Sequence, residues 1–216
     1  MKHEEILKNI IPELRADNTI SAVMLMGSVA AGCEYPTSDI DLFLLGNKNK
    51  FQTDSVDGIQ VECLYITYET AKARLDRSGM EVYHYLGSKI IYDLDGRLLK
   101  LIRNAMIKYS NYRVSERERI ELKHYLCSVK VKLNASIRQG DCLKTEFLTA
   151  TVSWKIIEAV FYINEIPLPP TSTIMRELRK LKNIPDNDWF DNLFSKDTQI
   201  RLNTMLTIID WAVPLL

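Results

Sequence analysis

The sequence predicts an α/β unit over residues 1–110, followed by an all-α helical unit over residues 111–216. Two observations lead to this prediction. Short apolar runs bounded by Gly, Pro, Asn or Asp, which are typical of strands, occur in the first half of the chain. From Asp95 onward, the apolar residues instead recur at the three- and four-residue spacing of amphipathic helices.

The elements of the first unit are expected to alternate between helix and strand. In the N-terminal segment, Ile6, Ile10 and Leu14 share one helical face. The polar segment 46–58 is expected to be a connection whose ends form turns. In chain order, we expect a helix over 2–16, a strand over 20–26, a short helix over 28–32, strands over 39–45 and 59–66, a helix over 67–77 and a strand over 89–92.

The second unit is expected to consist of helices with recognisable ends. Ser115 and Glu118 form the Ser-x-x-Glu pattern of a capping box, and Gly140 follows the expected end of that helix. The next long helix should stop before the proline-rich segment 166–170. The remaining expected helices cover residues 141–164, 172–182, 187–194 and 196–212.

Composition excludes several classes of protein. The 216 residues include 28 Lys+Arg and 28 Asp+Glu, and 46% are hydrophobic, which excludes an intrinsically disordered chain. Proteins that bind a long polyanion usually carry an excess of basic residues, because neutralisation of the phosphates supplies most of the binding affinity. The zero formal net charge therefore disfavours a long nucleic acid as the main partner.

Cysteine spacing and hydropathy indicate the compartment. The four cysteines form neither a disulfide framework nor a zinc-ligand pattern, and no apolar run of about 18 residues is present. We therefore expect a cytoplasmic protein without a membrane span. The apolar C-terminal stretch 205–216 can pack internally or against a second chain, which leaves a homodimer open.

A Gly-Ser pair follows the expected strand 20–26. The strand delivers Gly27 and Ser28 to the start of a helix, where free backbone amide groups favour phosphate. Gly27 lets the backbone approach a ligand closely, and the Ser28 hydroxyl can donate a further hydrogen bond. This pair therefore predicts a phosphate site.

Two aspartates follow ten residues later. Asp39 and Asp41 lie two apart on the expected strand 39–45, so both side chains should emerge on one face with Cα atoms about 6.5 Å apart. Adjacent carboxylates suit Mg²⁺, which prefers a few carboxylates plus substrate phosphates. Glu62, an isolated charge in the strand 59–66, can complete an acidic triad if the two strands pair, either as a metal ligand or as a general base.

With these residues, segment 20–66 resembles the nucleotidyltransferase superfamily that includes DNA polymerase beta. The narrower resemblance is to streptomycin/spectinomycin adenylyltransferases, which show a similar Gly-Ser to Asp-Ile-Asp spacing and a Pro-x-Ser before the aspartates, here Pro36-Thr37-Ser38. The resemblance implies a small mixed sheet flanked by helices, followed by a helical bundle that helps to bind the acceptor. It also implies that Asp39 and Asp41 hold Mg²⁺, that Gly27 and Ser28 hold a triphosphate, and that Glu62 binds metal or acts as the base.

The activity implied by this resemblance is metal-dependent transfer of a nucleoside monophosphate, AMP from ATP, to a hydroxyl of a small molecule such as an aminoglycoside-like antibiotic. A two-metal site is compatible with the three acids. Glu146 in the helical unit is a rival to Glu62 as the general base. Two alternatives remain open: a protein-modifying or antitoxin-type nucleotidyltransferase, and a non-catalytic module that senses nucleotides.

Overall fold

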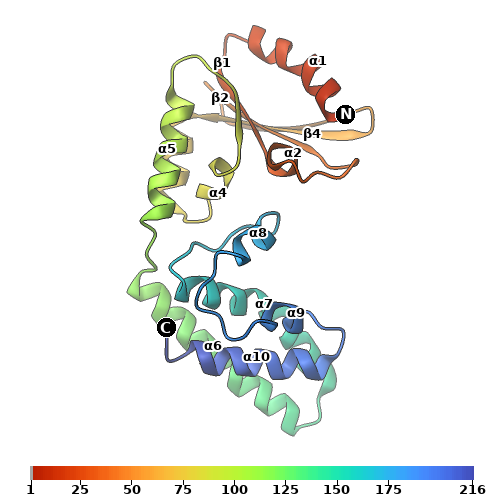
Figure 1. Cartoon of the computed structure of the whole chain (residues 1–216), viewed down its shortest axis with the longest axis vertical. Coiled ribbons are helices and arrows are strands. Elements are labelled where there is room, and N and C mark those ends of the chain that lie inside the picture. The colour runs from red at the N-terminus through yellow and green to blue at the C-terminus, as the bar shows by residue number, and fades with distance from the viewer. Residues whose placement is uncertain (1) are drawn as a thin grey trace. The chain divides into compact units, whose positions relative to one another are not determined.

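The computed structural model describes residues 2–216, which divide into two compact units (Figure 1). The first unit contains the chain up to Asn111 together with Pro169–Ile174, and the second contains Tyr112–Leu168 and Met175–Leu216. Each unit is described by itself.

A five-stranded mixed sheet forms the centre of the first unit. The strand order is β3-β4-β2-β1-β5, in which β2 and β4 are parallel and all other neighbours are antiparallel. Together with the helices that follow it in the chain, this sheet confirms the predicted fold class. In chain order, the elements are α1 (Lys2–Ala16), β1 (Ile20–Met26), α2 (Gly27–Ala31), β2 (Ile40–Gly46), β3 (Lys50–Val56), β4 (Ile59–Thr67), α3 (Tyr68–Arg77), α4 (Val82–Tyr85), β5 (Lys89–Asp93) and α5 (Arg97–Ser110).

Helices cover both faces of this sheet, and Figure 1 shows α1 and α5 on opposite sides of it. Side chains alternate between the faces along each strand. On β2, Ile40, Leu42 and Leu44 pack in the core that includes α1, whereas Phe43 and Leu45 pack in the core that includes α3, α4 and α5. The sheet is therefore buried on both sides along most of β1 and β2.

Strand β3 was not predicted, because segment 46–58 was expected to be a polar connection. Lys50–Val56 instead pairs with β4 through a hairpin whose turn contains Asp57 and Gly58, both at positive φ. As an edge strand, β3 leaves most of its residues exposed, so its sequence lacks the apolar alternation of a half-buried strand. The four-residue helix α4 was also missed, and α2 begins at Gly27, one residue earlier than expected.

The C-terminal part of the chain is helical, as predicted. Its first helix begins with a complete capping box, in which Ser115 Oγ accepts from the Glu118 amide and Glu118 Oε2 accepts from the Ser115 amide. The helices are α6 (Glu116–Arg138), α7 (Cys142–Ile163), α8 (Ile174–Leu178), α9 (Trp189–Leu193) and α10 (Thr198–Ala212).

Helix α10 packs against α6 and α7, so much of the apolar C-terminal stretch is internal. Met205, Ile208, Ile209 and Ala212 are buried in this unit, whereas Leu215 is 45% exposed. Within residues 2–216, no helix is both long and apolar enough to cross a membrane.

Candidate active site

The three acidic residues singled out by the sequence lie together in the first unit. One carboxylate oxygen from each of Asp39, Asp41 and Glu62 lies within 4.8 Å of the other two. Asp41 is the second residue of β2, and its parallel partner in β4 is Glu62. The strand register therefore places two carboxylates side by side on neighbouring strands.

The alternation of side chains explains why Asp41 and Glu62 share a face. Asp41 lies on the same face as Phe43 and Leu45, because Ile40 and Leu42 point into the opposite core. On β4, the residues on both sides of Glu62 likewise belong to the core that contains α1. The cluster lies at the start of β2, where the apolar row on this face ends.

Asp39 differs from its expected position, because β2 begins at Ile40 rather than at residue 39. The pairing with β1 ends at Met26 and Asp41, and the pairing with β4 starts at Ile40 and Val61, so no strand residue pairs with Asp39. It is exposed at the end of the loop that leads into β2. Its carboxylate nevertheless joins the cluster.

The electrostatic environment of Asp41 is unfavourable to its charge. Burial, together with the negative charges of Asp39 and Glu62, raises the pKa of Asp41 to about 6, and the nearby His84 acts in the opposite direction. The cluster therefore holds more negative charge than its surroundings neutralise. A divalent cation would relieve this repulsion, and a set of carboxylate oxygens is the donor set that Mg²⁺ prefers. These residues fit a magnesium ion.

His84 is a neighbour of the site that no sequence motif singles out. It lies in α4, and its Nδ1 is 3.3 Å from Oε1 of Glu81. Its proximity to Asp41 depends on how α4 packs against the sheet, 43 positions later in the chain. No sequence pattern signals that proximity.

Gly27 and Ser28 lie beside the carboxylates. Met26, the last residue of β1, is the antiparallel partner of Asp41, and α2 begins directly after it. Gly27 has φ +68°, and a Cβ built on it would lie 2.0 Å from Oδ2 of Asp41. A side chain at position 27 would therefore clash with Asp41. This is a second reason for a glycine here, besides the close approach of a ligand. Ser28 is half-buried in the first turn of α2.

The rival base Glu146 lies in the other unit. It is exposed on α7, and its Oε1 accepts a hydrogen bond from Oγ1 of Thr198 at 3.2 Å. The choice between Glu62 and Glu146 as the general base stays a prediction.

The first unit is similar to a known protein family, and the chain is similar in fold to a solved structure. Residues 8–77 match the family model described as polymerase beta, nucleotidyltransferase. The matched segment contains all five residues singled out by the sequence, which are Gly27, Ser28, Asp39, Asp41 and Glu62. The chain is also similar in structure to a nucleotidyltransferase-like protein from Exiguobacterium sibiricum, with a TM-score of 0.52 and 10% identity over 98% of this chain and 74% of that one. The comparison with curated proteins found no match.

These findings support the predicted superfamily. The family match supports a nucleotidyltransferase domain in the first unit, and the structural similarity, at 10% identity, concerns the fold alone. A nucleotidyltransferase domain in turn supports nucleotide transfer as the general activity. The narrower resemblance to the streptomycin/spectinomycin adenylyltransferases stays a prediction.

Proposed function

We propose that this protein is a magnesium-dependent nucleotidyltransferase that transfers a nucleoside monophosphate, expected to be AMP from ATP, to a hydroxyl group of a small molecule. The observation that supports this most is the convergence of Asp39, Asp41 and Glu62 beside Gly27, within a segment that matches a nucleotidyltransferase family model. The narrower sequence resemblance makes aminoglycoside-like compounds the first acceptors to test.

Asp39 and Asp41 would hold Mg²⁺, with Glu62 either as a third ligand or as the base. When bound, one or two such ions would neutralise the charge that develops on the attacking and leaving oxygens. The raised pKa of Asp41 supports a binding role, because its charge is costly without a cation. The carboxylates of Asp41 and Glu62 are positioned by paired strands, which are more rigid than loops.

Gly27 and Ser28 would hold the triphosphate. Helix α2 has only five residues, so its dipole is weak and the amide N–H groups of its first turn must supply most of the attraction. The half-buried Ser28 hydroxyl can donate one more hydrogen bond to a phosphate oxygen. The absence of a side chain at Gly27 leaves room for both Asp41 and the ligand.

In the proposed reaction, the acceptor hydroxyl oxygen forms a bond to the α-phosphorus while the bond from that phosphorus to the bridging oxygen breaks. The hydroxyl proton passes to a carboxylate, for which Glu62 and Glu146 are the candidates, and pyrophosphate leaves. The attacking and leaving oxygens must lie roughly in line. No covalent intermediate with the protein is required.

The test is a pyrophosphate-release screen of the four nucleoside triphosphates against aminoglycosides, lincosamides and other polyhydroxylated compounds. Asp39→Asn and Asp41→Asn should each abolish a release that the unmodified protein shows. Asp57→Asn is the matched control, because Asp57 lies in the exposed β3–β4 turn at φ 52°, a conformation that asparagine tolerates. Full activity of either cluster variant would refute the assignment.

Two further experiments separate the alternatives. Labelled ATP incubated with a cell lysate would leave the label on a protein band if the acceptor is a protein side chain. A nucleotide-sensing module would be stabilised by Mg-ATP in thermal unfolding without any pyrophosphate release across the acceptor panel.

A further inference from the structure

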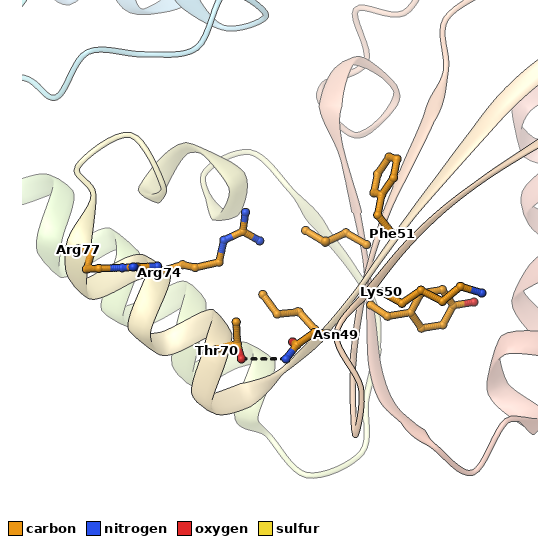
Figure 2. Close-up of a pocket in the computed structure, with 9 residues that line it drawn as sticks. Asn49, Lys50, Phe51, Thr70, Arg74 and Arg77 are labelled. Carbon is orange, nitrogen blue, oxygen red and sulfur yellow. Dashed lines mark hydrogen bonds between the residues drawn. The ribbon is translucent and has the colours of Figure 1, made fainter.

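A cavity of about 400 Å³ lies on the first unit between α3 and the β3–β4 hairpin (Figure 2). This volume is within the range of small-molecule sites, roughly 300–1,000 Å³. The residues that line it come from two strands and one helix of the same unit: Asn49, Lys50, Phe51, Leu64, Tyr65, Ile66, Thr70, Arg74 and Arg77. The five motif residues are absent from this lining: Gly27, Ser28, Asp39, Asp41 and Glu62.

This cavity, here called the hairpin pocket, adjoins the acidic cluster. Leu64, which lines it, is two residues beyond Glu62 on β4, so both side chains lie on the same face of the sheet with Cα atoms about 6.5 Å apart. The cross-strand partner of Leu64 is Phe51, and that of Glu62 is Thr53. The hairpin pocket thus begins one pleat away from the carboxylates.

The order of the strands indicates whether the pocket lies nearer the acceptor or the triphosphate. Asp41 on β2 lies between β1, which leads into Gly27 and Ser28, and β4, which carries Glu62 and leads toward the pocket. If the triphosphate lies at the β1–α2 junction, pyrophosphate leaves on that side. Since the attacking oxygen must lie roughly opposite the leaving oxygen, the acceptor approaches from the β4 side. The hairpin pocket is on the acceptor's side.

The charge of the pocket comes from two arginines on α3. Figure 2 shows the Arg74 side chain extending from the helix toward the strands, whereas Lys50 points away from the helix. Lys50 lies over the ring of Tyr65, 6.0 Å from its centroid. Arg74 also pairs with Glu81 at 3.7 Å, so part of its charge is offset. Arg77, one turn further along α3, is exposed.

The remaining lining residues leave few polar groups to compete with the arginines. Asn49 Nδ2 donates to Thr70 Oγ1 at 3.1 Å, and Asn49 Oδ1 accepts from the Thr67 amide at 3.0 Å, so this amide is already engaged at the start of α3. Phe51 is 58% exposed on the edge strand β3. An exposed aromatic ring beside guanidinium groups suits a ligand with a flat or apolar part and an anionic group.

We propose that the hairpin pocket binds the acceptor substrate, and that this acceptor carries an anionic group, phosphate or carboxylate, in addition to the hydroxyl that reacts. The anionic group would pair with Arg77 and Arg74, and the flat part would lie against Phe51. This inference rests on the proposed function and narrows its substrate class to hydroxyl compounds that also carry an anionic group.

Binding can be tested without nucleotide or metal, and therefore independently of transfer. Phenyl phosphate and benzoate serve as the two anionic probes and phenol as the neutral one, with affinities measured by NMR titration of the full chain in EDTA. Arg77→Gln and Phe51→Ala change exposed residues, so both variants should fold. Arg103→Gln, an exposed arginine on α5 outside the pocket, is the matched control.

We expect at least one anionic probe to bind more tightly than phenol, with affinity lowered fivefold or more by Arg77→Gln and by Phe51→Ala but not by Arg103→Gln. Which of the two probes binds identifies phosphate or carboxylate. Equal binding of phenol, or anion binding that resists both pocket variants and is lost in Ser28→Ala, would overturn the proposal. Failure of the proposed function is a different result: no pyrophosphate release, and no binding of Mg-ATP, with anion binding at the pocket intact.

Discussion

Nε2 of His3 lies 2.8 Å from the carbonyl oxygen of Ser38, which joins the first turn of α1 to the loop directly before Asp39. His3 is 3% exposed although it is close to the start of the chain. The same loop is closed by Ser38, whose Oγ accepts from the Tyr35 amide at 2.9 Å. Because Asp39 has no strand partner, this tether is a main constraint on where its carboxylate lies.

His3→Ala should therefore weaken metal binding at the acidic cluster. We expect a several-fold loss of Mn²⁺ affinity, measured by electron paramagnetic resonance, and a destabilisation of about 1 kcal/mol because the half-buried Ser38 carbonyl loses its donor. His3→Gln retains an N–H donor and should restore part of the metal affinity. His124→Ala, which changes an exposed histidine on α6, is the control. Unchanged Mn²⁺ affinity in His3→Ala would show that the tether does not position Asp39.

Gly27→Ala should remove metal binding, since the new Cβ would lie 2.0 Å from Oδ2 of Asp41 and must displace that carboxylate. Gly32→Ala is a closely matched control: Gly32 has φ +69°, nearly the same as Gly27, but nothing lies within 4 Å of its Cβ. Both variants should lose about 1–2 kcal/mol from the left-handed backbone conformation. Only Gly27→Ala should lose Mn²⁺ affinity and nucleotide transfer. Equal loss in both variants would assign the effect to backbone strain.

The apolar strands were predictable because a strand that is buried on both faces has a continuous apolar sequence. Ile20–Met26 and Ile59–Thr67 are apolar runs between turn residues. Glu62 stood out as an isolated charge in such a run, and Asp41 as one of two aspartates spaced two residues apart. The register that pairs Asp41 with Glu62 was not predictable, because it depends on a parallel pairing of strands that are joined through β3. A local pattern cannot specify which strands become neighbours.

Two further parts of the site were hidden for different reasons. Strand β3 is mostly exposed at the sheet edge, so its polar sequence resembles that of a loop. Because β3 contributes Lys50 and Phe51 to the lining, the hairpin pocket could not be predicted without this strand. His3 and His84 reach the site through helix packing, and an isolated histidine in a helix carries no signal of its contact. The acidic cluster could be predicted from the sequence, whereas its surroundings required the tertiary structure.

Asp41→Asn should stabilise the metal-free protein above pH 6. The native pKa of Asp41 is about 6 against an ordinary value of 3.8, so the native state binds the proton more tightly than the unfolded state. That contribution is fully present below pH 3.8 and is lost as the pH rises through 6, a loss of up to about 3 kcal/mol. In EDTA, the melting temperature of Asp41→Asn should exceed that of the unmodified protein at pH 8, and the difference should shrink at pH 4.5. A lower melting temperature at pH 8 would contradict the repulsion between the carboxylates.

The affinity for Mn²⁺ should fall as the pH drops below 6. A metal ion requires deprotonated ligands, so each bound cation must displace the Asp41 proton, and affinity should decrease about tenfold per pH unit below the pKa. Glu62→Gln removes one of the charges that raises this pKa, so the titration midpoint of Asp41 in the metal-free variant should move to lower pH. Carbon-13 chemical shifts of the Asp41 carboxyl group, followed with pH in EDTA, measure that midpoint directly. An unchanged midpoint in Glu62→Gln would mean that burial and the charge of Asp39 account for the raised pKa of Asp41, and that the two paired strands do not couple their carboxylates.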